Sequence, residues 1–181
     1  MDAAIPYPEP PLAGVEFVMR AFRTNDHGAA LELERDPAAA RWVPELPAAD
    51  GAGVVAFYDE CRRGGSLLHL VIADRRTDAY LGEAMLALGE HGVGEVGCCV
   101  VPAMRARGIA TEVIRVLSDW APATLGLGRV HVFVAPENTP AMRVAEGAGF
   151  QREGLLRSYW EIDGARVDVV VLSRLPEDER R

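Results

Sequence analysis

The sequence predicts a mixed α/β sheet, of the α+β type, folded as one domain. In the middle of the chain, strand-like apolar runs alternate with stretches of helical periodicity, which is typical of a sheet covered by helices. On either side, strand-like runs follow one another through short polar turns, as in hairpins. The 181 residues, of which 49% are hydrophobic and 25% charged, are enough for one domain with a sizeable core.

The first part of the chain is expected to combine one strand with helices. Residues 1–12 are rich in Pro and Ala and are expected to be mobile, residues 13–175 to form the single domain, and residues 176–181 to form a charged tail. The elements predicted first are a strand at Val15–Phe22, a helix through Leu31 and Leu33 that begins within Thr24–His27, a turn or short helix at Asp36-Pro37, and an amphipathic helix at Ala52–Arg63.

The central part is predicted to contain neighbouring strands. Leu67–Ala73 and Ala79–Leu88 have the composition of strands and are joined by a polar turn at 74–78. A Gly-rich loop, Gly89–Gly94, leads into a further strand at Glu95–Val101. The next helix should pack one apolar face on the sheet, formed by Ile109, Val113, Val116, Leu117 and Trp120.

The last part predicts a buried strand, a short helix and a hairpin. Arg129–Ala135 is nearly all apolar and is therefore expected to be central. Thr139 as the N-cap, Pro140 as the first helical residue and Gly149 just beyond the end frame a short helix. An Asp-Gly pair favours two-residue hairpin turns. The predicted hairpin comprises Leu155–Ile162, the turn Asp163-Gly164 and Val167–Leu172.

Charge and composition exclude several classes of partner. A net charge of −8 argues against nucleic acid, because binding to phosphates needs a basic face. No apolar run approaches the roughly 18 residues that span a bilayer, and the N-terminus lacks a signal-peptide pattern, so we expect a cytoplasmic protein without a membrane partner. All 19 Lys and Arg residues are Arg, which excludes a Walker A lysine, a Schiff-base lysine and a pyridoxal phosphate anchor.

Cysteines and histidines give no sign of a metal or redox site. Three cysteines provide neither a disulfide framework nor metal-ligand spacing, and we expect no metal. Cys98 and Cys99 should point to opposite faces of a strand and pack as small apolar side chains. The four histidines show no ligand or triad spacing and are expected to be structural or exposed: His27, His69, His91 and His131.

The stretch Val100–Thr111 is the most informative for function. A strand-like run gives way to a turn with Arg105, Arg107 and Gly108, and then to a helix. The first N–H groups of a helix have no intrahelical partner, so they can converge on an anion that the helix dipole also favours. The two arginines would add charge-assisted hydrogen bonds. With the segment Asn138–Phe150, which follows at a spacing that allows one helix and one strand, this pattern indicates an acyl-CoA enzyme.

From Val15 to Leu175 the sequence resembles the GNAT superfamily of N-acetyltransferases, especially the branch of the RimJ and RimL ribosomal-protein N-terminal acetyltransferases. The resemblance implies a mostly antiparallel central sheet that splays at the cofactor site, about four packed helices, and acetyl-CoA or coenzyme A as cofactor. The motifs that carry it are Glu95-Val96-Gly97, Arg105-x-x-Gly108-x-Ala110-Thr111, Asn138 with Gly149-Phe150, Glu153-Gly154, and Asp163-Gly164 followed by Asp168.

The resemblance also implies which residues bind the cofactor. Val100 and Val101 would hold pantetheine through their main chain, because an open edge inside a sheet offers N–H and C=O groups to an amide-bearing arm. Asn138 resembles the family's side-chain contact to the cofactor, and Arg143 is expected at its phosphate or adenine end. The implied pyrophosphate contacts are Arg105, Ala106, Arg107, Gly108, Ile109, Ala110 and Thr111.

Acetyl transfer to an amine needs a neutral nucleophile, a polarised thioester carbonyl and a proton source for the thiolate. Many relatives carry a Tyr or Ser on the short helix as the acid, but this chain has Ala141 and Ala145 there. Glu95 as base or water relay and Tyr159 as acid are the expected catalytic residues. The assignment of acid and base stays open among Tyr159, Ser158, Glu161, Glu95 and Glu83.

The sequence therefore favours an acetyl-CoA-dependent N-acetyltransferase that transfers the acetyl group directly to a primary amine. The acceptor is either a protein N-terminus or a small-molecule amine. The alternative, motivated by Ala141 and Ala145, is a non-catalytic acyl-CoA-binding or sensing protein of the same fold. A nucleotide-binding module is a weaker third hypothesis, because Gly-x-Gly-x-x-Gly and Walker A patterns are absent. Acyl-chain preference and a homodimer through exposed strands or the first helices stay open.

Overall fold

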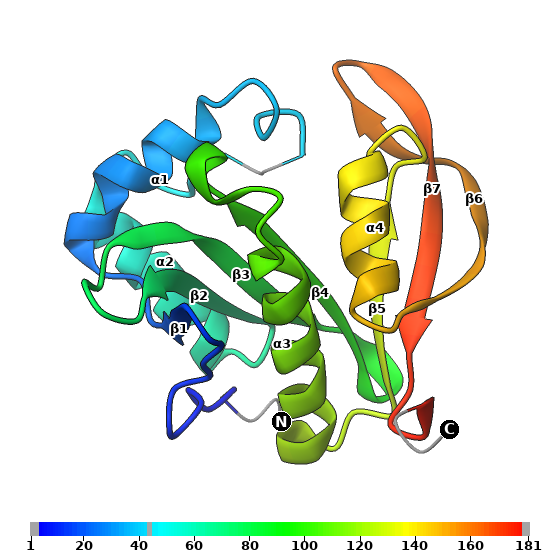
Figure 1. The fold of residues 1–181 in the computed structure, drawn as a ribbon, viewed down its shortest axis with the longest axis horizontal. Helices are drawn as coiled ribbons and strands as arrows, with labels where there is room; N and C mark the ends of the chain where they lie inside the picture. Colours follow the sequence, from blue (N-terminus) through cyan, green and yellow to red (C-terminus); the bar gives the residue numbers. More distant parts are fainter. Residues whose placement is uncertain (1–3, 43–44, 179–181) are drawn as a thin grey trace.

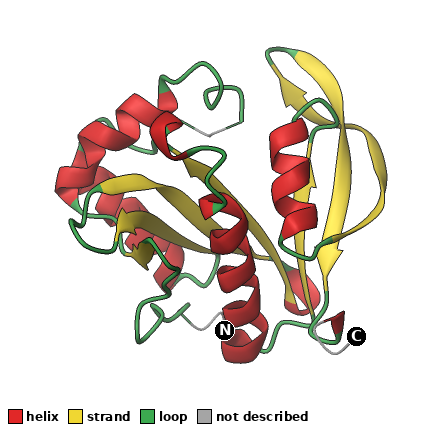
Figure 2. Ribbon diagram, viewed as in Figure 1, coloured by secondary structure: helices red, strands yellow, loops and turns green. Residues whose placement is uncertain are grey.

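The computed structural model describes residues 4–42 and 45–178, which form a seven-stranded sheet with helices on both faces (Figures 1 and 2). The strand order is β1-β2-β3-β4-β5-β7-β6, and all neighbours are antiparallel except β4 and β5. The strands are β1 (Phe17–Arg20), β2 (Leu67–Asp74), β3 (Tyr80–Leu88), β4 (Val93–Val100), β5 (Arg129–Val134), β6 (Gln151–Ile162) and β7 (Ala165–Arg174). The α-helices of the described residues are α1 (His27–Glu34), α2 (Gly51–Arg63), α3 (Ile109–Leu125) and α4 (Thr139–Gly147).

The predicted fold class is confirmed: the sheet is mixed, mostly antiparallel, and covered by helices. The strand predicted at Val15–Phe22 is shorter than expected, because β1 pairs with β2 only over Phe17–Arg20. Strand β4 begins at Val93, inside the predicted Gly-rich loop, because pairing with β3 and β5 extends the strand through Gly94. Glycine favours a loop locally, and the tertiary pairing overrides that preference.

The start of α4 corrects one prediction. Asn138, not Thr139, is the N-cap, because its side-chain oxygen accepts a hydrogen bond from the N–H of Ala141 at 3.3 Å. Thr139 and Pro140 are therefore the first two helical residues. Both Asn and Thr can cap a helix, so the sequence alone could not decide between neighbours.

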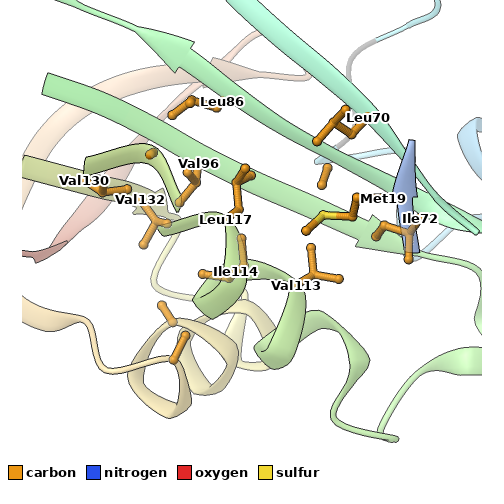
Figure 3. Close-up of a cluster of buried hydrophobic side chains, with 14 of the residues drawn as sticks. Met19, Leu70, Ile72, Leu86, Val96, Val113, Ile114, Leu117, Val130 and Val132 are labelled. Atoms are coloured by element: carbon orange, nitrogen blue, oxygen red, sulfur yellow. The ribbon is translucent and has the colours of Figure 1, made fainter. Parts of the chain in front are cut away.

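The main core lies between the sheet and the helices α3 and α4 (Figures 1 and 3). Side chains of β2 and β4, such as Leu70 and Val96, meet Val113 and Leu117 of α3 there. A smaller cluster on the opposite face packs Val54 of α2 against the alternate residues of β2. The two faces of the sheet are thus covered by different helix pairs.

Strands β4 and β5 separate soon after they meet. They pair in parallel over three positions only, from Val93 opposite Arg129 to Glu95 opposite His131. Beyond Glu95 the two halves of the sheet diverge, and Figure 1 shows β4 and β5 parting above this junction. The β5-facing N–H and C=O groups of β4 beyond Glu95 have no strand partner in the described structure.

Part of the N-terminal segment is packed on the domain. Within the segment expected to be mobile, Ile5 is 1% exposed and donates its backbone N–H to the carbonyl of Arg62 at 2.9 Å. This residue is thus packed against the end of α2, because burial of its side chain offsets the cost of ordering the backbone. Residues 1–3 and 179–181, which belong to the predicted lead-in and tail, lie outside the described residues. No helix within residues 4–42 and 45–178 is long and apolar enough to cross a bilayer.

Gly82 of β3 provides a test of the sheet next to the divergence. Its φ is +149°, and a Cβ atom there would lie 2.1 Å from the carbonyl oxygen of Cys99 on β4. We predict that Gly82→Ala lowers the free energy of unfolding by about 3 kcal/mol, because β3 and β4 must move apart. Urea unfolding measures this. The control Gly28→Ala, on α1 with open space around it, should raise stability by about 0.5–1 kcal/mol; equal stability of both variants would contradict the prediction.

Candidate active site

The loop between β4 and α3 has the geometry of an anion cradle. Ala106 and Gly108 have positive φ angles of 58° and 82°, and α3 begins directly afterwards without a side-chain N-cap. Within the described chain, the backbone N–H groups from Ala106 to Thr111 donate to no acceptor, and the first that does is Glu112, to Gly108. Unpaired N–H groups at the start of a 17-residue helix are suited to bind a phosphate.

Both arginines of this loop are ion-paired in the structure. Arg105 donates to Asp36 and, at 3.3 Å, to the carbonyl of Val100, and its side chain is 34% exposed. Arg107 donates from Nη2 to both oxygens of Glu16 at 3.0 and 3.1 Å, and both side chains of that pair are nearly half exposed. An exposed pair contributes little stability. Arg107 can therefore exchange Glu16 for a phosphate more easily than Arg105 can exchange Asp36.

A cavity of about 550 Å³ opens where β4 and β5 diverge. Its lining includes consecutive residues of β4, from Glu95 to Cys99, whose side chains alternate between the two faces of the sheet, so the cavity reaches both faces. Helix α3 begins at its edge: Ala110 belongs to the cradle and also lines the cavity. The lining residues toward α3 and α4 include Val96, Cys98, Ala110, Ile114, Asn138, Ala141, Val144 and Ala145. Those toward α2 and the loop before it include Trp42, Glu45, Phe57, Tyr58, His69, Glu83, Met85, Glu95, Gly97 and Cys99.

The side of the cavity toward α3 and α4 is apolar, and several side chains of the helices that line it are small. Ala110 of α3 and both Ala141 and Ala145 of α4 line it, and these small residues leave room for an extended chain between the helices and the parted strands. Asn138 lines the same side, with its oxygen used in the N-cap of α4. The structure thus brings Asn138 and the cradle to one continuous surface.

Glu95 lies at the point where β4 and β5 part. It lines the cavity, its side chain is 33% exposed, and one carboxylate oxygen lies 3.9 Å from Nε2 of His131. Burial raises the pKa of Glu95, because the charged form loses hydration and gains no arginine. Burial and the nearby Arg129 lower the pKa of His131, so this histidine is neutral at pH 7. The environment of Glu95 is that of a carboxylate suited to accept a proton.

A second polar cluster lies on the α2 side of the cavity, and the sequence predicted only part of it. Glu83 of β3 accepts from Tyr80 at 2.7 Å and lies 2.9 Å from Nε2 of His69 on β2. The ring of Tyr58 stacks on His69 with centroids 3.7 Å apart. Glu83 was a candidate from sequence, whereas His69 was expected to be merely structural or exposed. The signal was present in the predicted β2–β3 hairpin, whose register places these two residues on one face.

Other predicted residues lie outside the cavity. Tyr159 of β6 does not line it, is 49% exposed, and packs its ring 5.2 Å from Phe133, which does line it. Its neighbour Trp160 lines the cavity instead. Arg143 is exposed on α4, with no ion pair in the described structure. The structure therefore does not bring Tyr159 and Glu95 together around the cavity.

The two adjacent cysteines lie on opposite faces, as predicted. The thiol of Cys98 donates to the carbonyl of Ala110 at 3.8 Å on the α3 side, and Cys99 pairs with Glu83 on the other side. Burial raises the pKa of Cys98 to about 12 and that of Cys99 to about 11. Both thiols are protonated at neutral pH, which argues against a nucleophilic role. No group of three or more His, Cys, Asp and Glu within the described ranges could hold a metal ion.

The sheet splits between β4 and β5, and the cradle lies beside the split, as the resemblance implied. The comparison with protein families leads to the same family. Residues 16–151 match the acetyltransferase (GNAT) domain. The chain belongs to the GNAT acetyltransferase family. It is 40% identical over 130 residues to "Probable N-acetyltransferase YjcK" of Bacillus subtilis, which covers 70% of this chain and 72% of that protein. It is 30% identical over 159 residues to N-alpha-acetyltransferase RimI of Mycobacterium tuberculosis, covering 87% and 89%.

Solved structures share the fold of this GNAT protein at low sequence identity. RimJ of Mycobacterium smegmatis, solved with CoA-disulfide, superposes with a TM-score of 0.79 at 24% identity, covering 91% of this chain and 84% of that one. Spermidine N-acetyltransferase of Vibrio cholerae, solved with CoA and spermine, gives 0.77 at 22%, covering 93% and 100%. The chain is an N-acetyltransferase that uses acetyl-CoA, and the comparisons do not favour the non-catalytic alternative.

The raised pKa of Glu95 predicts a pH-dependent stability difference. A carboxylate whose folded-state pKa lies above its ordinary 4.5 destabilises the fold once it is ionised. At pH 4 the side chain is largely protonated in the folded state, so Glu95→Gln should have almost the wild-type stability. As the pH rises from 4.5 through the raised pKa, the wild type should lose stability relative to the variant. Thermal unfolding at pH 4 and pH 7.5 measures this, and a variant less stable at pH 7.5 would contradict it.

Proposed function

We propose that this enzyme binds acetyl-CoA along the α3 and α4 side of the split sheet and acetylates a primary amine that enters from the α2 side. One observation carries the proposal: the cavity is continuous from Ala110, in the anion cradle, to Glu95, on the opposite face of β4. The donor and the acceptor can thus approach the gap between β4 and β5 from opposite sides. This arrangement supports direct transfer without a covalent enzyme intermediate.

The cofactor contacts proposed for this chain follow the free backbone groups. The N–H groups of residues 106–111 would hold the pyrophosphate, with Arg107 as the charged side chain that leaves Glu16. Val100 and Val101 would present main-chain groups to pantetheine where β4 has no partner in β5. Asn138 lines the same surface, and Arg143 is free to reach the adenine or phosphate end.

The chemical step assigned to Glu95 is removal of a proton from the acceptor ammonium, directly or through water. Acetyl-CoA supplies the acetyl group as a thioester. The neutral amine then forms a C–N bond to the acetyl carbon as the C–S bond breaks, and the second ammonium proton balances the charge of the departing thiolate. A backbone N–H of β4 near Val100 is proposed to stabilise the carbonyl oxygen. Glu95 returns its proton to solvent.

The source of the thiolate proton is not a side chain of α4. Ala141 and Ala145 line the cavity where many relatives have a hydroxyl, and Tyr159 lies outside the lining. Once the C–N bond has formed, the nitrogen carries a proton that must be lost. This proton can reach the thiolate through water. Tyr159 remains a predicted acid only if β6 moves toward the cavity when substrates bind.

The RimJ and RimL branch is part of this proposal. Support comes from the fold shared with RimJ of Mycobacterium smegmatis, whereas the RimI protein among the sequence relatives and the spermidine enzyme among the structures widen the range of amines. We therefore take both protein N-termini and small amines as acceptors to test.

Release of free thiol from acetyl-CoA in the presence of a panel of amines and N-terminal peptides tests the function. We predict turnover with at least one acceptor and a fall in kcat of about 100-fold or more for Glu95→Gln, because a general base contributes that much. The acid limb of the pH profile should disappear in the variant. Glu90→Gln, an exposed change next to β4 and outside the cavity, should keep wild-type kinetics. CoA binding without turnover on any acceptor would favour the non-catalytic alternative.

Arg107→Ala tests the cradle. We predict a rise in the Kd for CoA of about 10-fold, because a charge-assisted hydrogen bond to the pyrophosphate is lost. Calorimetric titration measures the Kd. Glu16→Gln should tighten binding slightly, since Arg107 no longer has a competing carboxylate. Arg115→Ala, exposed on α3 outside the loop, is the matched control; an equal loss in both arginine variants would remove Arg107 from the proposed site.

A further inference from the structure

The cavity contains negative charge that no arginine balances. Its described lining includes three carboxylates, Glu45, Glu83 and Glu95, and no arginine. Elsewhere in the chain, partly or fully buried carboxylates such as Asp26 and Asp36 are paired with arginine. A carboxylate withdrawn from water is costly without a cation. The lining therefore favours a cationic ligand.

Glu83 is held in a fixed position by two donors. Its side chain is 13% exposed, with Oε1 accepting from Tyr80 and Oε2 facing Nε2 of His69. The 2.9 Å contact with Glu83 places a proton of His69 on Nε2, so a ring that carries a single proton has its lone pair on Nδ1. The hydrogen-bond network thus assigns Nδ1 as an acceptor.

The Nδ1 atom of His69 has no partner. His69 is 8% exposed and lines the cavity, and its Nδ1 is buried without a hydrogen bond to any described residue. The ring is held by Glu83 on one edge and by the stacked ring of Tyr58 on its face, at 2° from parallel. A buried acceptor of this kind is normally satisfied. An ammonium N–H supplies both the missing donor and the missing positive charge.

Glu83 and Glu95 occupy the same face of the sheet at a fixed separation. Glu83 pairs with Cys99, and Cys99 follows Glu95 by four positions on β4, so the two backbone positions are about 13 Å apart along the strand. Gly97 lies between them on β4, opposite Met85. Because it has no side chain, it leaves space over the sheet, which forms the floor of the cavity. A linear ligand can lie along this floor with one end at each carboxylate.

We propose that Glu83 and His69 form a second ammonium site, so that the preferred acceptor is a linear diamine or polyamine. The reacting nitrogen lies at Glu95, and the second nitrogen binds Glu83 and donates to Nδ1 of His69. The aromatic lining residues Phe57 and Tyr58 contact the methylene chain and the cation between them. This inference rests on the proposed function, in which Glu95 faces the reacting amine.

The test compares acetyl-CoA-dependent acetylation of linear diamines, from propane to octane, with that of n-alkylamines of matching length. The wild-type enzyme should prefer the diamine by about 10- to 100-fold in kcat/KM, mostly through KM, because one hydrogen-bonded charge pair is gained. The preference should peak at one chain length, since the two carboxylates are fixed. Glu83→Gln should bring the diamine-to-monoamine ratio close to one, mainly by raising the KM for diamines.

Control measurements distinguish a loss of the diamine preference from a general loss of folding or activity. Glu60→Gln, exposed on the same helix as Tyr58 and outside the lining, should keep the wild-type ratio. Calorimetry on the unmutated protein with CoA should show diamine binding at least about 10-fold tighter than monoamine binding, which does not depend on any variant folding.

Equal use of diamines and monoamines, or a preference that survives Glu83→Gln, would overturn the second site while leaving N-acetylation intact. Peptides with a free N-terminus turned over faster than every diamine would also overturn it, and no turnover with any amine would instead refute the proposed function.

Discussion

The active site depends on the separation of β4 from β5 after three paired positions. Had the ladder continued beyond Glu95, the N–H and C=O groups of both strands would satisfy each other and the cavity would close. Helix α3 packs on β4 and helix α4 on β5, with Thr111 of α3 touching the end of α4 at Gly147. The two halves of the sheet are thus covered by different helices, and the backbone groups of β4 that lack a strand partner are available to a ligand. The cradle at the start of α3 lies at the edge of the same gap.

Electrostatics divide the site into two unlike halves. The loop before α3 presents N–H groups and arginine, whereas the α2 side of the cavity presents carboxylates and aromatic rings. In the proposed function, an anionic donor and a cationic acceptor therefore approach from opposite sides of β4. In the same proposal, the carboxylates favour the charged form of a bound ammonium, so its deprotonation needs a base whose pKa is raised. The proposal assigns that role to Glu95, whose pKa is raised by burial at a cost to the stability of the fold.

The arginines of the cradle have unequal roles. Arg105 connects the loop to Asp36 after α1 and to the carbonyl of Val100, so it fixes the loop to the α1 side of the molecule. Arg107 has only one ion-pair partner among the described residues, the exposed Glu16, and this pair is screened by water and can be replaced by a phosphate. The sequence treats the two arginines alike, because both precede Gly108, and their partners come from distant parts of the chain.

Local pattern was sufficient for most elements and for the cradle. Apolar periodicity predicted α2 and α3, the Asp163-Gly164 turn predicted the last hairpin, and the Arg-x-x-Gly turn predicted an anion site before a helix. It failed where neighbours in space decide: the start of β4 at Val93, the cap at Asn138, and the packing of Ile5. The placement of Tyr159 outside the cavity also depends on a register shift in β6 that no local signal reveals.

The sequence by itself determined the family, the order of strands and helices, and the chemistry of the loop before α3, because each is carried by residues close together in the chain. Only the tertiary structure decided which carboxylates lack a cation and which buried nitrogen lacks a partner. Glu83, His69 and Tyr58 come from three different elements, and their contacts follow from strand register and helix packing. Register and packing depend on the whole sheet, so no single segment of the sequence specifies them.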